Sequence, residues 1–482
     1  MFFLTILGIV LRLFNINKPE GLWNDEYVSW YVSSFPFCDG FWQEILKQCH
    51  APLYYIYLKP FVSCSDLILR FTSLIPGVLA IVIMYFVGKE FSKKCGYYAA
   101  AITSVLSFLV YYSQEVRFYS LLFLFSALSL LFTIKYLKNG TKENLTGYII
   151  SNLLIMLTHT IGFIFVFFNI LYVIFKKKNI NKTIILTFFI VFLILYLSMG
   201  KYIISMIPAS QWWGHFSYTN ILFLFTDYFS PILTNHINAP SRFFYNKDLT
   251  IWLVTPTLIA IIGLCFGAKK FKGLLYIAIG TILILSVAAI MGKLVFITKY
   301  SIEILPILLL VTAYGFEKLK TIGTILLTIF LAFHLFAAFT PNYVTLKPRN
   351  EGHKIVGDIL KQQNSDYVLF TYYDENRFSR YINLENKKVK SISKKNRFEY
   401  KDNATKILDE INKAESVSIV FLDSISFLNE EMVKAQNPKI PEMFTTFSKI
   451  RIDLSKELLK NYTINNINKK GSWLVIKATK RT

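Results

Sequence analysis

Long apolar runs are the feature that most restricts how this chain can fold. Ile184–Leu197 and Tyr276–Ile290 are apolar around the whole circumference of a helix, whereas a surface helix of a soluble protein keeps one polar face. Such runs recur up to about residue 340, with lengths close to the roughly 20 residues that cross a bilayer. Because 54% of the residues are hydrophobic and only 17% are charged, they predict a polytopic α-helical membrane protein.

We interpret eleven of these runs as membrane-spanning helices, among them 96–112 and 183–199. Alternate connections carry groups of lysines, which cytoplasmic loops of membrane proteins retain. We therefore assign those connections to the cytoplasm, and the odd number of crossings places the region after about residue 340 outside. The same arrangement accounts for the formal net charge of +22. No basic patch with interleaved aromatic residues indicates a nucleic-acid partner.

The apolar runs also divide the chain into two predicted domains. A transmembrane domain over 1–340 has two long outer connections, at 17–66 and 200–249. The second contains Trp212 and Trp213, which suit a lid anchored at the membrane surface. Residues 345–482 alternate helix-like and strand-like segments, which predicts a soluble extracytoplasmic α/β domain.

Two features near the amino terminus have structural interpretations. Arg12 lies in the first apolar run, and we expect its charged end to reach toward the membrane surface. Cys38 and Cys49 both fall in the first outer connection, where a disulfide and two unpaired thiols remain alternatives.

An adjacent pair of carboxylates, Asp25 and Glu26, follows the first run by a few residues and is flanked by aromatic residues. A carboxylate at the membrane surface can act as a general base. Acids at this position can instead cap the start of a helix, by accepting hydrogen bonds from free backbone N–H groups. The dipeptide alone leaves both roles open.

Further polar and aromatic residues recur at the same predicted membrane depth. A surface ion pair or a satisfied loop histidine is the ordinary interpretation of each one alone. Five successive outer connections nevertheless each provide such a group, while the interiors of the runs contain few charges. This favours an active site at the membrane surface over a path through it. The residues are His50, Glu115, Arg117, Tyr119, His159, Trp212, Trp213, Lys299 and Tyr300.

Three of these motifs together resemble a known family. They are the Asp25-Glu26 pair, a His-x-Pro-Leu-Tyr-Tyr run at 50–55 and a Tyr-Ser-Gln-Glu-x-Arg-x-Tyr run at 112–119. In order and spacing over about 1–340, the chain is similar to bacterial relatives of protein O-mannosyltransferases and aminoarabinose transferases, which are GT-C glycosyltransferases. The family usually has a second proline where Ala51 stands, and an arginine where Lys299 stands.

The resemblance implies an inverting transfer of a sugar from a polyprenyl-phosphate donor to a glycan, lipid or protein acceptor. Asp25 would be the general base, and Glu26 would help to position the acceptor or share the charge. Arg117, Lys299 and His50 would stabilise the departing phosphate. Glu115 would orient Arg117 or a sugar hydroxyl, and Tyr119 and Tyr300 would offer hydroxyl hydrogen bonds or stacking surfaces. Some members use a divalent cation and others do not, which leaves the metal open.

Two other classes of function remain alternatives. A transporter or lipid flippase would show paired hydrophobic halves and ionisable residues near the membrane midplane. A non-catalytic receptor or scaffold would use the carboxy-terminal domain for binding and the acids as helix caps. The resemblance favours an enzyme of a bacterial cytoplasmic membrane, with its active site and carboxy-terminal domain on the extracytoplasmic side.

Overall fold

The computed structural model describes most of the amino-terminal two thirds of the chain and the ordered elements of the remainder. The contacts divide the chain into two compact units. The first unit contains Met1–Ile16 and Val28–Lys347, and the second contains Asn17–Tyr27 and Pro348–Thr482. The described residues are 1–17, 21–177, 188–194, 197, 219–231, 247–291, 297–339, 353–370, 380–382, 388–391, 413–422, 462–470 and 473–480.

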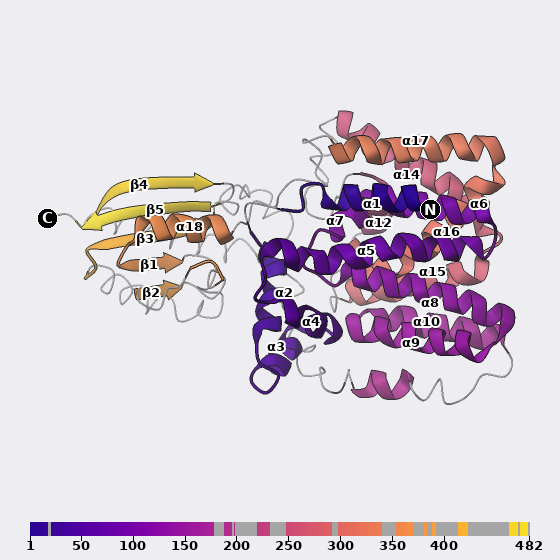
Figure 1. The fold of residues 1–482 in the computed structure, drawn as a ribbon, viewed down its shortest axis with the longest axis horizontal. Helices are drawn as coiled ribbons and strands as arrows, with labels where there is room; N and C mark the ends of the chain where they lie inside the picture. Colours follow the sequence, from indigo (N-terminus) through magenta and orange to yellow (C-terminus); the bar gives the residue numbers. More distant parts are fainter. Residues whose placement is uncertain are drawn as a thin grey trace. The chain divides into compact units, whose positions relative to one another are not determined.

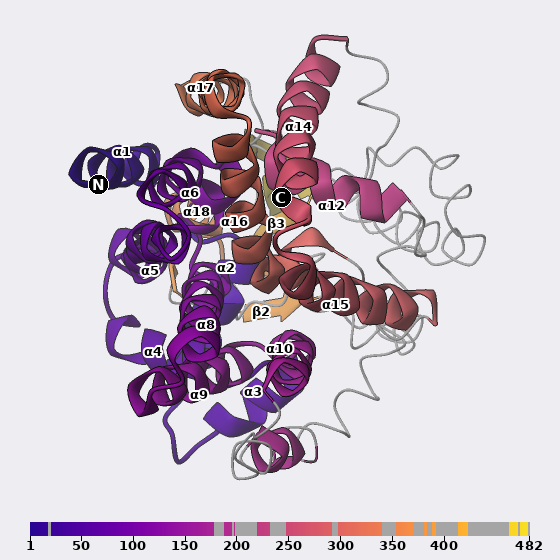
Figure 2. The same cartoon turned by 90° about the vertical axis from the view of Figure 1, so that its right-hand side faces the viewer.

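The first unit is a bundle of helices that lie side by side (Figure 1) and are seen nearly end-on in Figure 2. Helices α5 and α6, α8 and α9, and α14 and α16 form its main packed pairs. The long elements are α1 (Phe2–Leu13), α5 (Asp66–Lys89), α6 (Lys93–Val105), α8 (Tyr119–Asn139), α9 (Lys142–Thr158), α10 (Gly162–Lys176), α14 (Lys247–Ala268), α15 (Lys272–Ile290), α16 (Leu305–Lys318) and α17 (Lys320–Phe339).

Shorter elements connect these helices, and Figure 1 shows α2, α3 and α4 among them at one end of the bundle. They are α2 (Asn24–Ser34), α3 (Phe41–Gln48), α4 (Leu53–Leu58), η1 (Lys59–Phe61), α7 (Ser107–Tyr112), α12 (Thr219–Phe229) and η3 (Thr298–Ile304). Several helices begin where the sequence provides a side-chain cap. The hydroxyls of Ser65, Ser92 and Thr141 accept bonds from the backbone N–H groups of Ile68, Cys95 and Asn144.

Five helical stretches among the described residues have the length and apolar composition to cross a membrane. They are Asp66–Lys89, Tyr119–Asn139, Lys272–Ile290, Thr298–Lys318 and Lys320–Phe339. Phe2–Leu13, Gly162–Lys176 and Val254–Ala268 are apolar but shorter. The predicted single crossing at 96–112 is broken at Leu106, between α6 and α7. Most of the predicted crossing at 183–199 lies outside the described residues.

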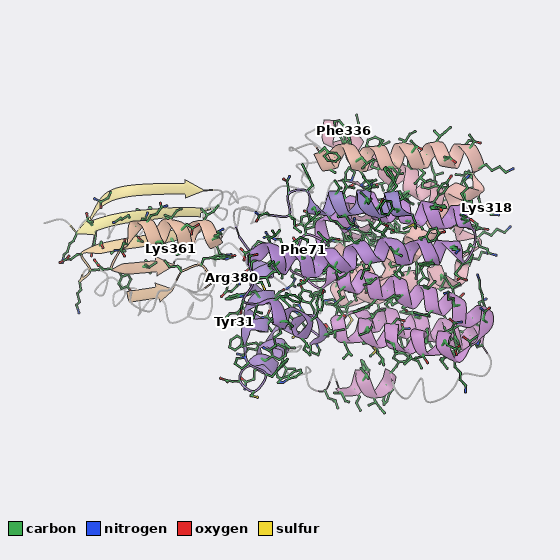
Figure 3. The ribbon with its side chains drawn as sticks, in the orientation of Figure 1. Tyr31, Phe71, Lys318, Phe336, Lys361 and Arg380 are labelled. Carbon is green, nitrogen blue, oxygen red and sulfur yellow. The ribbon has the colours of Figure 1, made fainter. Side chains whose placement is uncertain are left out.

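The lysine-rich connections gather at one end of the bundle. Lys138, in the last turn of α8, bonds Glu90, directly after α5, with 3.0 Å between Nζ and Oε2. Phe91 packs on Phe271, which precedes α15, at 4.7 Å between ring centroids. Figure 3 shows Lys318 at this end of the unit and Tyr31 of α2 at the other. The alternation of the lysine groups along the sequence therefore corresponds to a spatial grouping.

Arg12 corrects the expectation that it reaches to the membrane surface. Its side chain is fully buried and donates hydrogen bonds to the carbonyl oxygens of Gly8, Thr103 and Ser104. A further bond runs from Nε to the Ser113 hydroxyl. Helix α6 ends at Val105, so its last carbonyls have no partner within the helix. Arg12 satisfies them, because an unpaired carbonyl in an apolar surrounding is costly.

Two devices hold the helices at close range. Gly263 and Gly267 of α14 face Gly315 of α16 so closely that a Cβ atom on Gly315 would lie 1.8 Å from the carbonyl oxygen of Gly263. Small residues allow this approach, as in other membrane helix pairs. Buried hydrogen bonds also connect α8, α9 and α10, because Asn169 Nδ2 donates to Ser129 Oγ at 2.9 Å and Asn152 Oδ1 at 3.2 Å.

The second unit contains one helix, α18 (His353–Gln363), and a five-stranded sheet among its described residues. The strand order is β2-β1-β3-β5-β4, with β1 parallel to β2 and β3, and β5 antiparallel to β3 and β4. The strands are β1 (Tyr367–Phe370), β2 (Lys388–Ser391), β3 (Ser416–Leu422), β4 (Tyr462–Lys470) and β5 (Trp473–Lys480). Val417, Ser418, Ile419 and Val420 of β3 are all buried, so both faces of this central strand are covered.

Candidate active site

Six of the predicted site residues come together at the end of the first unit opposite Lys318. They lie where helices end: His50 after α3, Arg117 between α7 and α8, Tyr119 at the start of α8, His159 after α9, and Lys299 and Tyr300 in η3. Binding residues are often found on such connecting segments, which a rigid scaffold positions. The up-and-down path of the helices thereby groups residues that lie far apart in sequence.

Arg117 is held in a fixed orientation. Its side chain is only 5% exposed, and Nη1 donates a hydrogen bond to the Ser29 hydroxyl of α2 at 3.2 Å. The guanidinium carbon lies 4.9 Å from the ring centroid of Phe118 and 5.9 Å from that of Tyr119. The backbone is fixed as well, because Ser73 Oγ donates to the Arg117 carbonyl. Packing against aromatic faces favours the cation and restricts its rotamers.

Lys299 places a second cation against the same tyrosine. Its Nζ lies 5.6 Å from the ring centroid of Tyr119 and 5.6 Å from that of Tyr300, and the side chain is 7% exposed. The segment around it is anchored by α12, because Thr298 Oγ1 donates to Asp227 Oδ2 at 2.8 Å. Two buried positive charges thus share Tyr119 as a neighbour, an arrangement suited to an anion with several oxygens.

Aromatic and imidazole rings form a continuous stack beside the cations. His159 packs on Phe118 at 4.5 Å and on Tyr300 at 5.9 Å, both nearly parallel. His50 lies 5.3 Å from Phe118, and its Nδ1 shares a hydrogen bond with the Tyr55 hydroxyl. Flat faces with polar edges are typical of surfaces that contact sugar rings.

Burial and neighbouring charges set the state of His159. Burial, and then the charges of Arg117 and Lys299, lower the pKa of His159. His159 is therefore neutral at pH 7, and it can donate or accept a hydrogen bond without adding charge. Glu115 is also buried, two residues before Arg117, and its carbonyl oxygen accepts the Arg117 backbone N–H at 2.7 Å.

The adjacent carboxylates Asp25 and Glu26 differ in burial and in hydrogen bonding. Both lie in the first turn of α2, where negative charge is favourable. Glu26 is buried, and its Oε2 accepts the backbone N–H of Trp23 at 3.1 Å, which is the backward half of a capping box. Asp25 is partly exposed. The capping alternative therefore describes Glu26.

The structure also adds residues and leaves others undescribed. Ser29, Tyr55 and Phe118 contact the predicted residues but were not themselves predicted to belong to the site. Only their spacing in the sequence could have indicated them; Ser29, for example, lies one helical turn after Asp25. Trp212 and Trp213 lie outside the described residues.

Cys38 and Cys49 are free thiols, so the disulfide alternative is not realised. Among the residues that the structure describes, no three His, Cys, Asp or Glu side chains are grouped closely enough for a metal ion.

Comparison with known proteins places the fold. Residues 52–200 match the family described as dolichyl-phosphate-mannose-protein mannosyltransferase. No curated protein matches the chain by sequence. The apo structure of ArnT from Cupriavidus metallidurans superposes with a TM-score of 0.58 at 8% identity, over 99% of this chain and 97% of ArnT. The chain has the fold of the GT-C glycosyltransferases.

Two further GT-C structures are similar. The Archaeoglobus fulgidus oligosaccharyltransferase in complex with Zn and sulfate has a TM-score of 0.53 at 13% identity, over 90% of this chain and 69% of that protein. ArnT from Cupriavidus metallidurans bound to undecaprenyl phosphate has a TM-score of 0.52 at 8% identity, with 99% and 97% covered. The apolar helices and the shared fold make this chain an integral membrane protein.

Proposed function

We propose that this protein transfers a sugar from a polyprenyl-phosphate donor to an acceptor at the outer face of a bacterial cytoplasmic membrane. The observation that supports this most strongly is the pair of buried cations, Arg117 and Lys299, that share the Tyr119 ring. A GT-C relative was crystallised with undecaprenyl phosphate. A lipid-linked phosphate would keep its tail in the bilayer while its charge meets these side chains.

The chemistry follows from these charges. As the acceptor oxygen attacks the anomeric carbon, the bond from that carbon to the phosphate oxygen breaks, and its electron pair leaves with the phosphate. Arg117 and Lys299 would stabilise the charge that grows on the departing group. At 4 Å and an effective dielectric constant near 20, each cation contributes on the order of 4 kcal/mol.

Asp25 is proposed as the general base that removes the acceptor proton as the new bond forms. Attack from the face opposite the phosphate would give inversion at the anomeric carbon. Glu26 would support this role indirectly, because its carboxylate accepts the Trp23 backbone N–H and so fixes the first turn of α2, which carries Asp25. Glu115 is proposed to orient Arg117 or a sugar hydroxyl.

The ring stack is proposed as the sugar-binding surface. Tyr300 and the neutral His159 offer flat faces, and His50 with Tyr55 offers hydrogen-bonding edges. Trp212 and Trp213 remain proposed as part of a lid from sequence alone. A carbohydrate, lipid or protein acceptor would approach from the side of the membrane opposite the lysine-rich connections.

Whether the reaction requires a divalent cation needs a test of its own. The Archaeoglobus fulgidus relative was crystallised with Zn, whereas the described part of this chain does not bring together three ligating side chains. Glu26 is used as a helix cap, which leaves Asp25 as the accessible acid of the pair. Sugar transfer measured after chelation with EDTA, and again after adding back Mg²⁺, Mn²⁺ or Zn²⁺, distinguishes a metal-assisted reaction from one that these side chains carry alone.

The test of the function is release of free undecaprenyl phosphate from undecaprenyl-phosphate hexose and pentose donors by the purified protein in lipid nanodiscs. Bacterial membrane extract supplies the acceptors. We expect release by the wild type and at least a roughly 100-fold loss in Asp25→Asn at equal folded amount. Asp66→Asn is the matched control, since Asp66 also lies in the first turn of a helix.

Each outcome has a distinct meaning. Full release by Asp25→Asn would keep the transferase and remove Asp25 from the base role. Absence of release from every donor by the wild type would refute the transferase and favour a transport or scaffold function.

A further inference from the structure

The start of the first outer connection belongs structurally to the carboxy-terminal part of the chain. Residues 17–27 group with 348–482 in the second unit, although more than 320 positions separate them in sequence. Leu22 is fully buried, as is His353 at the first position of α18. Gly21, Leu22 and Tyr27 all contact the carboxy-terminal segment, and both hydrogen bonds described below involve Leu22.

Both backbone groups of Leu22 are bonded to side chains of the carboxy-terminal part. Its N–H donates to the Tyr381 hydroxyl at 2.7 Å. Its carbonyl oxygen can only accept, so the 3.0 Å contact with His353 Nδ1 requires a proton on that nitrogen. The His353 ring also packs on Tyr27 at 5.7 Å between centroids. Leu22 is thus held at both polar groups.

Two glycines make this contact possible. Gly21 has a φ of +82°, and a Cβ atom there would lie 2.6 Å from Lys354 Cβ and 2.7 Å from the Tyr381 hydroxyl. A side chain at position 21 is therefore disfavoured by both backbone conformation and space. Gly357 of α18 similarly gives room to Tyr381, because a Cβ atom added to Gly357 would lie 2.9 Å from Tyr381 Cβ.

The fixed residue is close in sequence to the proposed base. Helix α2 begins at Asn24, two residues after Leu22, and Asp25 lies in its first turn. Trp23, the residue between Leu22 and α2, is held as well, because its backbone N–H donates to the Glu26 carboxylate. The direction in which the first turn of α2 leaves Leu22 thereby depends on the two bonds that hold Leu22.

We propose that His353 and Tyr381 are positioning residues for Asp25, so that the carboxy-terminal part of the chain is needed for catalysis itself. This inference rests on the proposed role of Asp25 as general base. A base displaced by about 1 Å can lose on the order of 100-fold in rate, whereas substrate binding at other groups is retained. Loss of either bond to Leu22 therefore lowers kcat and leaves the KM for the lipid donor unchanged.

The experiment compares three substitutions in the full-length protein. Tyr381→Phe removes the acceptor for the Leu22 N–H, and His353→Ala removes the donor to its carbonyl. His353→Asn places an amide N–H near the position of Nδ1 and should restore the bond. We expect at least a tenfold fall in kcat for Tyr381→Phe and His353→Ala, and a smaller fall for His353→Asn.

Tyr462→Phe is the matched control within the same unit. Tyr462 is buried, and its hydroxyl donates to the Ala414 carbonyl at 2.7 Å, away from residues 21–27. It should lose a similar amount of thermal stability and keep the wild-type kcat. An equal fall in kcat for Tyr462→Phe, or wild-type kcat for both Tyr381→Phe and His353→Ala, would overturn the proposal.

Hydrogen exchange separates this inference from the proposed function. Tyr381→Phe should accelerate exchange of the amides of residues 22–27 at least tenfold, whether or not a donor is turned over. Faster exchange with an inactive wild type would support the positioning contact while refuting the transferase. Unchanged exchange in an active protein would refute the positioning contact alone.

Discussion

Replacing Arg117 by methionine should remove one of the two cations that we assign to the departing phosphate. The side chain is 5% exposed, so water screens its charge poorly, and it is already oriented by Ser29 at 3.2 Å and by the Phe118 ring. Little reorganisation is then needed when charge develops. Removal of one such preorganised group typically costs about 2.7–4 kcal/mol, which is roughly 100- to 1,000-fold in kcat.

Arg117→Lys separates the contribution of the charge from that of the hydrogen-bonding geometry. Lysine keeps the charge but lacks the planar fork, so it cannot hold Ser29 and two phosphate oxygens together. One lost charge-assisted hydrogen bond is worth about 1.5–3 kcal/mol, or roughly 10- to 150-fold. We expect the order wild type, Arg117→Lys, Arg117→Met in single-turnover release of undecaprenyl phosphate at saturating donor.

Arg12→Met supplies the matched control for removing a buried arginine. The hydrogen bonds of Arg12 go to three carbonyl oxygens and the Ser113 hydroxyl, so its loss should lower thermal stability and yield. Turnover per folded molecule should stay near that of the wild type. Arg117→Met with more than one third of wild-type turnover at equal folded amount would refute the reasoning about Arg117.

Two predictions concern the helix bundle. Gly315→Ala should lower the unfolding temperature in detergent, because the new Cβ would lie 1.8 Å from a backbone oxygen of Gly263. Gly147→Ala should lower it less, because the nearest atoms to its new Cβ belong to the Phe132 side chain and not to a backbone. Equal unfolding temperatures would contradict this. Asn169→Leu should cost about 0.6–2 kcal/mol of unfolding free energy by breaking the bonds among α8, α9 and α10, and an unchanged denaturation midpoint would argue against that network.

The ends of the helices show how far sequence reasoning reaches into the site. The sequence predicts that Arg117, Tyr119, His159 and Lys299 share one membrane depth, and the structure brings them together around Phe118 and Tyr300. Depth follows from counting apolar runs, which is a local property of the chain. Which ring each cation contacts depends on how the helices rotate about their axes, and no local pattern specifies that rotation.

The carboxylate pair shows the same limit at one residue. Asp25 and Glu26 are adjacent, and sequence alone allows either to be a cap or a base. The bond from Trp23 to Glu26 identifies Glu26 as a cap. The role of Asp25 as a base stays a prediction. The bonds of Leu22 to His353 and Tyr381 have no sequence signal, since nothing local connects segments so distant in the chain.

The sequence by itself determined that the chain enters a membrane and which connections carry the lysines. Those properties depend on the transfer of each side chain from water to hydrocarbon and on the period of a helix. Tertiary structure alone decided that Arg12 closes the end of α6, that Gly315 meets Gly263, and that residues 17–27 join the carboxy-terminal part. These are contacts between distant segments, and their free energy exists only once both segments are in place.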